Sequence, residues 1–381
     1  MNMKVLICSD SFKHSMGAME VCHSLAEGLE AERDDLHLTL LPLADGGEGT
    51  VQALVDATGG KMIQTQVHDP LMRIIPATYG LLGKGQTAVI EMAAASGIEK
   101  LAENERNPLL TTSYGTGELI RAALDQGCRK ILLGIGGSAT IDGGAGLLHA
   151  LGARFFDQNQ EPILPTGEKL HYIRHIDTST LDHRLKKTDI SVAGDVDNPL
   201  TGPHGAAYVY GPQKGARPGD LKMLDQNLEA YAHLLQKYTS HNLLSISGAG
   251  AAGGLAVSLL AFSLATLENG FNLVAHELNL EKVIQQNDLI ITGEGKIDEQ
   301  THYGKTPFGV ARLANKHNKP VVAVAGSLET NHLKGFDLLL PVMEKPMDLS
   351  TALASGKELL QNAGRRIAKI ISLTHRLQQK A

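Results

Sequence analysis

The stretch KILLGIGGSATIDGGAG (residues 130–146) joins a short apolar run to a loop rich in glycine. The run KILL is typical of a buried strand in a parallel sheet. Glycine is costly to order, and it is useful where a backbone takes a positive φ or approaches a ligand closely. Backbone N–H groups in such loops hold anions. We therefore predict a strand that ends in a phosphate-binding loop.

The same sequence of apolar run, polar glycine-rich loop and helical pattern recurs along the chain. Further strands are predicted at MKVLICSD (3–10), LHLTLLPL (36–43) and DLIITGEG (288–295), and an apolar helix at LAVSLLAFSLATL (255–267). Alternation of strands and helices predicts an α/β fold with mostly parallel sheets. In such sheets, ligands bind at the carboxyl ends of the strands.

The two ends of the chain share short strands that are apolar on both faces. A lone N-terminal strand and helix need partners, and the C-terminal strands match best. We therefore predict a discontinuous α/β domain of residues 1–67 plus 286–381, into which an α/β domain of residues 68–285 is inserted.

Composition excludes several classes of protein. The chain has 381 residues, is 43% hydrophobic and carries a net charge of −6, which argues against nucleic-acid or membrane partners. No apolar run approaches the ~20 residues of a membrane span. The cysteines are odd in number, lack a C-x-x-C pair and predict neither disulfides nor a zinc site. These features, and the lack of a signal-peptide pattern, predict a cytoplasmic protein.

The polar loops that follow the strands gather two kinds of charged side chain. Together with glycine loops, they supply what phosphoryl transfer needs: Mg²⁺ ligands, phosphate clamps and a base. Glu91, after an apolar run, is either a paired carboxylate or a site residue. The loop carboxylates are Asp10, Asp45, Glu48, Asp142, Asp195, Glu294 and Asp298, and the loop lysines are Lys13, Lys214, Lys296 and Lys305.

Two other functions stay open at this point. GIGGSA (134–139) fits the dinucleotide pattern G-x-G-x-x-A, so an NAD(H)-dependent dehydrogenase of a small hydroxy acid is one alternative. Glycines 143 and 144 would weaken the helix that this pattern requires. A non-catalytic ligand-binding protein is the other alternative. A Walker loop is absent, because Glu299 stands where its first glycine would precede GKT (304–306).

Eight motifs in order give the chain a family resemblance. They are DSFK (10–13), ADGGEGT (44–50), NPLLTTSYGTGELI (107–120), GIGGSATIDGG (134–144), DVDNPLTGPHGA (195–206), GPQKGA (211–216), GAGAAGG (248–254) and TGEGKIDEQTHYGKTP (292–307). This order resembles the bacterial type I glycerate kinases over about residues 4–341. Ile141 and Gly194 depart from the residues more common in that family, which affects loop detail and removes no charged candidate.

The resemblance implies ATP- and Mg²⁺-dependent phosphorylation of D-glycerate in glyoxylate and hexarate (glucarate, galactarate) degradation. It implies one flavodoxin-like domain and one restriction-endonuclease-like domain, with the active site in the cleft between them. It also implies 2-phosphoglycerate as product, whereas the residues alone select neither the 2- nor the 3-hydroxyl. Which domain binds ATP, the oligomeric state and any regulation are likewise left open.

Within that reaction, each loop receives an expected role. Asp195 is the first choice for the general base and Asp10 the second, with Lys13 and Asp45 as further catalytic groups. Substrate is expected at Ser11, Gly46, Gly47, Glu48, Thr111 and Ser113. Nucleotide is expected at Gly136, Gly137, Ser138, Lys214, Gly293, Gly295 and Lys305, and Mg²⁺ at Asp142 and Asp298.

Overall fold

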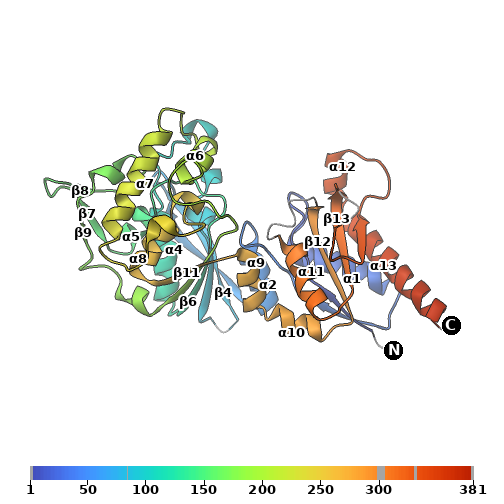
Figure 1. Ribbon diagram of the computed structural model, residues 1–381. Helices are drawn as coiled ribbons and strands as arrows, with labels where there is room; N and C mark the ends of the chain where they lie inside the picture. The colour runs from blue at the N-terminus through green and yellow to red at the C-terminus, as the bar shows by residue number, and fades with distance from the viewer. Residues whose placement is uncertain (1–2, 84, 298–304, 330–332, 379–381) are drawn as a thin grey trace. The chain divides into compact units, whose positions relative to one another are not determined.

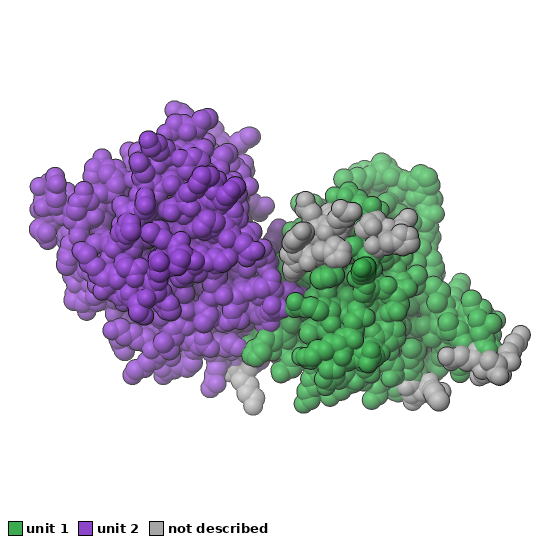
Figure 2. Space-filling view, in the orientation of Figure 1, with its two compact units in different colours: residues 1–45, 52–58, 274–381 green, residues 46–51, 59–273 purple. Residues whose placement is uncertain are grey.

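The computed structural model describes residues 3–83, 85–297, 305–329 and 333–378, and the chain forms two compact units (Figures 1 and 2). Unit 1 comprises Met1–Asp45, Gln52–Thr58 and Val274–Ala381, and unit 2 comprises Gly46–Val51 and Gly59–Leu273. The sequence-based division differs from these units at three places: residues 46–51 and 59–67 lie in unit 2, and residues 274–285 lie in unit 1. Residues 61–67 belong to unit 2 because they lie in a strand that pairs within its sheet.

Unit 1 contains a parallel sheet of five strands. In space their order is β14 (Leu338–Pro341), β13 (Val321–Leu328), β12 (Leu289–Ile297), β1 (Met3–Ile7) and β2 (Leu36–Leu40). Counted along the unit, this is the doubly wound order 2-1-3-4-5. The topological switch point of that order lies between β1 and β12, and ligands bind at the carboxyl ends of the strands there.

Helices cover this sheet, and α1 (Ala18–Glu30) packs along α13 (Gly356–Gln378) (Figure 1). Their backbones meet closely, since a Cβ at Gly28 would lie 2.0 Å from the Gln361 carbonyl oxygen. The core between them consists of buried apolar side chains such as Val21, Leu25 and Leu360. The remaining helices of the unit are α2 (Thr50–Thr58), α10 (Leu280–Gln285), α11 (Thr306–Lys316) and α12 (Leu349–Ala354).

Unit 2 contains a six-stranded sheet. The order is β11 (Leu264–Glu268), β10 (Asp189–Ala193), β6 (Lys130–Gly134), β5 (Thr87–Glu91), β4 (Ile74–Leu82) and β3 (Lys61–His68). The first four run parallel, while β4 is antiparallel to both β5 and β3. A small antiparallel sheet contains β8 (Pro162–Ile163), β7 (Arg154–Phe156) and β9 (His175–Asp177).

Short helices connect these strands. The α-helices are α3 (Ala93–Ser96), α4 (Tyr114–Asp125), α5 (Ala145–Ala150), α6 (Ala206–Tyr210), α7 (Leu221–Leu235), α8 (Ala256–Phe262) and α9 (Gly270–Glu277). The 3₁₀ helices are η1 (Ile98–Lys100), η2 (Glu103–Glu105), η3 (Lys169–Tyr172), η4 (His183–Lys187), η5 (Pro212–Lys214), η6 (Leu243–Ser245) and η7 (Ala251–Gly253). In the part of the chain that the structure describes, no helix is long and apolar enough to cross a membrane.

The structure confirms the α/β fold with mostly parallel sheets, and KILL lies in β6 as predicted. The predicted helix over 255–267 is wrong in its second half: α8 ends at Phe262 and residues 264–268 form β11. The reason is tertiary, because β10 supplies backbone hydrogen bonds along that segment. The two domain names and the active-site cleft stay predictions.

Candidate active site

The carboxyl ends of four parallel strands meet at one edge of the sheet in unit 2. Gly134 of β6 lies opposite both Glu91 of β5 and Ala193 of β10, and Ala193 lies opposite Glu268 of β11. The loops that leave these strands therefore share one edge. They are the segments 135–144, 194–205 and 269–270, together with residues 92–97, which include α3.

The segment Gly46–Val51 packs against this edge. A Cβ at Gly46, where φ is +90°, would lie 2.9 Å from the Ala193 Cβ and 3.0 Å from the Gly270 Cα. Only glycine permits this approach, and Gly47 lies beside Gly136. The structure thus brings Gly46 and Gly47, both expected at the substrate, next to the glycine loop after β6, whereas Glu48 is exposed on the same segment.

Glu91 is a paired carboxylate. Its Oε1 accepts a hydrogen bond of 2.9 Å from the backbone N–H of Val51, in the first turn of α2. Burial raises the pKa of Glu91, and backbone hydrogen bonds from residues 49–51 oppose the rise. Of the two sequence-based interpretations of Glu91, a paired carboxylate and a site residue, this hydrogen bond supports the paired carboxylate.

The turn after β6 presents unpaired donors. Gly136 and Gly137 are exposed, and Gly137 has a φ of 69°. Among the described residues, the backbone N–H groups of Gly136, Gly137 and Ser138 have no hydrogen-bond partner. The carbonyl of Gly137 accepts from Ile98 N, and Ala139 N donates to the Ser96 carbonyl, so the turn is fastened on both sides. Consecutive unpaired N–H groups form an anion-binding concavity.

Lys214 lies behind that turn. Its side chain ends η5 and is 2% exposed. Its Nζ donates to Ser138 Oγ at 2.6 Å and to the Thr140 carbonyl at 2.8 Å. Burial lowers the pKa of Lys214 to about 7, and the negative charge of Asp142 opposes that change. Lys214, predicted to contact the nucleotide, is thus buried and contacts the loop itself.

Asp142 is fully buried inside the same loop. Oδ2 accepts from Ser113 N at 2.7 Å and from Ser113 Oγ at 2.8 Å, and Oδ1 accepts from Gly144 N at 3.1 Å. Burial raises the pKa of Asp142, while these hydrogen bonds lower it. A metal ion would have to replace these donors, so the observed arrangement does not fit a metal ligand. The predicted metal role of Asp142 stays untested.

Thr111 and Ser113, expected at the substrate, are both buried beneath the loop. Thr111 Oγ1 donates to the Ala139 carbonyl at 3.0 Å, and Ser113 Oγ accepts from Leu147 N at 3.0 Å. These bonds tie the segment 111–113 to the loop and to α5. Both side chains hold the loop in this structure, and their contact with substrate stays a prediction.

Asp195 is exposed at the carboxyl edge of β10. Its Oδ1 accepts from Asn269 Nδ2 and from Gly270 N, each at 2.8 Å. The carboxylate thereby caps the first turn of α9 and joins the loops after β10 and β11. Asp195 therefore lies at the expected edge.

Unit 1 presents a second group of predicted residues at its switch point. Asp10 follows β1, its backbone N–H donates to the Gly293 carbonyl on β12, and its carboxylate accepts from Ser11 N at 2.6 Å and from Thr306 Oγ1 at 2.8 Å. Burial first, and the charge of Asp45 second, raise the pKa of Asp10 to about 6. Lys13, which is exposed, lowers it.

The loop after β12 brings further predicted residues to the same place. Lys305 precedes α11, and its Nζ lies 3.6 Å from Glu294 Oε2. Gly295 lies beside the backbone of Phe12 and Lys13. Asp298 lies outside the described residues. Among the described residues, no group of three His, Cys, Asp or Glu side chains could hold a metal ion.

Two contacts escaped sequence reasoning. Thr306 orients Asp10 from 296 positions away, and Asn269 binds Asp195 from 74 positions away. The only local signal for Thr306 is its place at the start of a helix before Pro307. No local pattern marks Asn269.

The chain is similar to known proteins over nearly its whole length. The family model described as "Glycerate kinase family" matches residues 5–372. The glycerate kinase of Bacillus subtilis (strain 168) is 46% identical over 97% of this chain and 98% of its own length. The glycerate 2-kinase of Escherichia coli (strain K12) is 44% identical over the same shares of the two chains.

A solved structure shows the same fold. The crystal structure described as that of a candidate glycerate kinase 2 from Salmonella typhimurium LT2 matches with a TM-score of 0.92. The two sequences are 45% identical, and the match covers 99% of this chain and 100% of the other.

Proposed function

The chain belongs to the glycerate kinase family, and on that premise we propose that it transfers the γ-phosphoryl group of ATP to D-glycerate, with 2-phosphoglycerate as product. The name of the Escherichia coli relative supports the 2-position. The observation that carries the proposal is the turn at Gly136–Ser138, where the three backbone N–H groups have no hydrogen-bond partner among the described residues. The proposed reaction belongs to glyoxylate and hexarate degradation, and the proposed location is the cytoplasm.

The turn after β6 is the proposed phosphate site. Phosphoryl transfer spreads negative charge over the phosphate oxygens, and fixed N–H donors stabilise that charge without reorganising. Gly136 and Gly137 leave the backbone accessible, and the segment Gly46–Gly47 adds glycines next to it. Gly293, Gly295 and Lys305 stay proposed nucleotide contacts of unit 1.

We assign the general base to Asp10 in preference to Asp195. A base works best when its pKa lies near the working pH. Burial and the Asp45 charge raise the pKa of Asp10 to about 6, and Ser11 and Thr306 hold its carboxylate in one orientation. Asp195 is exposed, and its Oδ1 caps α9. Substrate is proposed to contact Asp10, with the carboxylate of glycerate near Lys13.

The proposed transfer forms one bond and breaks one. The 2-hydroxyl oxygen of glycerate forms a bond to the γ-phosphorus, and the bond between that phosphorus and the β,γ-bridging oxygen breaks. The hydroxyl proton passes to the Asp10 carboxylate, and ADP leaves with the bridging oxygen.

Mg²⁺ is the proposed cofactor, and when bound it neutralises phosphate charge. The described residues predicted to hold it fit poorly, because the Asp142 oxygens already accept hydrogen bonds from Ser113 and Gly144. Phosphate oxygens and water supply most Mg²⁺ ligands in kinases. Among the described residues we therefore assign none to the metal, and Asp298, which lies outside them, stays a proposed Mg²⁺ ligand.

The dehydrogenase alternative receives no support from the loop. A dinucleotide fingerprint opens a helix directly after its glycines. Here Ala139 pairs with Ser96, and the next helix, α5, begins only at Ala145. The ligand-binding alternative predicts binding without turnover.

The deciding experiment is ³¹P NMR of the purified protein with ATP, Mg²⁺ and D-glycerate. We expect a phosphomonoester signal that couples to the C2 proton. Coupling to the C3 protons would keep the kinase and move the position of transfer. If ATP is not consumed, the proposed function is wrong.

The choice of base has its own test. Asp10→Asn is expected to lower kcat by roughly 10²–10⁴-fold. Asp195→Asn, which keeps an oxygen acceptor for Gly270 N, is expected to lower kcat far less. The reverse order of the two effects would return the base to Asp195.

A further inference from the structure

Lys214 has a buried amino group that forms no ion pair with the described residues. It lies in η5, its side chain is 2% exposed, and among the described residues no carboxylate oxygen lies within 4.0 Å of its Nζ. Its partners are two neutral oxygens, Ser138 Oγ and the Thr140 carbonyl. Burying a charge without a close counter-charge is costly, so a stable fold would do better with an apolar residue here. This free-energy cost indicates that Lys214 serves a function other than stability.

We infer that Lys214 is a positioning residue for the phosphate site: it reaches no ligand itself, and it holds Ser138 so that the turn at Gly136–Ser138 can bind a phosphoryl group. The inference rests on the proposed function, which places ATP at that turn. It replaces the direct nucleotide contact that the sequence predicted for Lys214.

The hydrogen bond from Lys214 decides what Ser138 can do. When Lys214 is protonated, Nζ can only donate, so Ser138 Oγ is then the acceptor of their 2.6 Å hydrogen bond. The hydroxyl proton of Ser138 has no acceptor among the described residues and remains free to donate. Ser138 therefore adds a side-chain donor beside the three unpaired backbone N–H groups of the turn. The positive charge of protonated Lys214 behind them also favours an anion in front.

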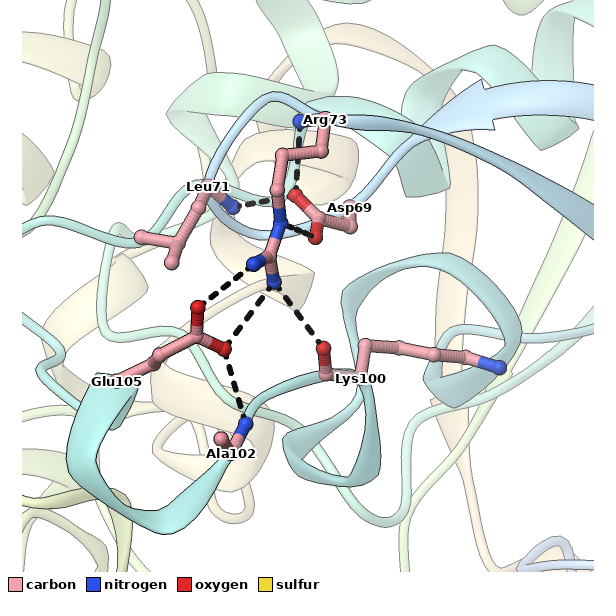
Figure 3. Close-up of polar contacts among 6 residues, drawn as sticks. All are labelled: Asp69, Leu71, Arg73, Lys100, Ala102 and Glu105. Atoms are coloured by element: carbon pink, nitrogen blue, oxygen red, sulfur yellow. Dashed lines mark hydrogen bonds and ion pairs between the residues drawn. The ribbon is translucent and has the colours of Figure 1, made fainter.

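The backbone of Gly215, the residue after Lys214, packs closely against Arg106. Gly215 has a φ of +91°, and a Cβ there would lie 2.1 Å from the Arg106 carbonyl oxygen. Arg106 directly follows η2, whose Glu105 accepts hydrogen bonds from Arg73, at 2.7 Å from Nη1 and 3.3 Å from Nη2 (Figure 3). Arg73 Nε in turn donates to the buried Asp69 at 2.6 Å. This network fixes the surface against which η5 packs.

The test uses Lys214→Met, Ser138→Ala and the double variant, with Lys222→Met as the control. Lys222 is an exposed lysine on the neighbouring α7, so its loss removes a charge from the same unit without touching the loop. Each protein is assayed for the KM of ATP, for kcat, for the Kd of ATP by calorimetry and for thermal stability.

We expect Lys214→Met to raise the KM and the Kd of ATP about tenfold or more, with the Tm equal to or above that of the wild type. Ser138→Ala should raise both by a similar factor, and the double variant should add little, because the two residues act through one hydrogen bond. Lys222→Met should match the wild type. Weakened ATP binding without loss of Tm is not what a purely structural lysine would show.

Several outcomes would overturn the inference. One is an unchanged Kd of ATP in Lys214→Met, and another is additive effects of the two single variants. If Lys214→Met fails to fold, Ser138→Ala decides alone: wild-type ATP affinity in that variant refutes the positioning role. If the wild type binds ATP and does not phosphorylate glycerate, the proposed function is refuted. The Kd of ATP in the variants would then still decide whether Lys214 positions the phosphate site.

Discussion

Replacing Asp10 by asparagine is expected to stabilise the protein at neutral pH while it removes turnover. Burial and the charge of Asp45 raise the pKa of Asp10 from 3.8 to about 6, so the folded state binds this proton more tightly than the unfolded state does. Stability contributed by the protonated form is fully present below pH ~4 and is lost as the pH rises through ~6. Above that range, the folded protein bears the whole cost of the ionised carboxylate.

The size of the effect follows from that shift. A rise from 3.8 to about 6 corresponds to about 3 kcal/mol at ~1.4 kcal/mol per pKa unit. Because the side chain is half-buried, solvent screening reduces the value to about 1–2 kcal/mol. Asparagine keeps the shape: its oxygen can accept from Ser11 N, and its amide can donate to Thr306 Oγ1.

The assay is urea or thermal unfolding of wild type and Asp10→Asn at pH 4 and pH 8. The variant should exceed the wild type by about 1–2 kcal/mol at pH 8, or about 2–6 °C in Tm, and match it at pH 4. Asp288→Asn is the control, since Asp288 is exposed at the opposite end of the same strands and accepts only Lys4 N at 2.9 Å. An Asp10→Asn variant that is less stable at pH 8, or that keeps wild-type turnover, would refute the reasoning.

Three further predictions concern unit 2. Asp142→Asn should lower the free energy of unfolding, measured in urea, by about 2–4 kcal/mol, because an amide cannot accept from donors on both sides. Asp157→Asn is the control and should match the wild type, because one oxygen of Asp157 accepts both turn hydrogen bonds. Burial lowers the pKa of Lys214 to about 7, so we expect Lys214 to take up a proton when ATP binds near pH 7.5. Calorimetry in buffers of different ionisation enthalpy measures this uptake, and Lys214→Met should lose it. Glu91→Ala should remove the hydrogen bond to Val51 N at the start of α2 and lower the free energy of unfolding by about 1 kcal/mol. Unchanged hydrogen exchange over residues 46–58 would contradict this prediction.

The sequence predicted secondary structure correctly where that structure depends on residues nearby in the chain. The apolar runs at 3–10 and 288–295 form β1 and β12, the two strands of the switch point, because uninterrupted apolar residues need burial on both faces. The glycines at 136 and 137 do form an exposed turn. By contrast, the run at 255–267 is apolar enough for a helix or a strand, and pairing with β10 decided that its second half is a strand.

Sequence alone determined which segments carry the polar loops, since strand, turn and glycine patterns depend on neighbours in the chain. The tertiary structure decided what each polar side chain does. Lys214 meets Ser138 across 76 positions, and Asp10 meets Thr306 across 296. Asp142, which looks from its loop like a metal ligand, accepts hydrogen bonds from Ser113 and is closed off from solvent. A side chain's burial and partners depend on which distant segments the sheet order brings together, and no local pattern encodes that order.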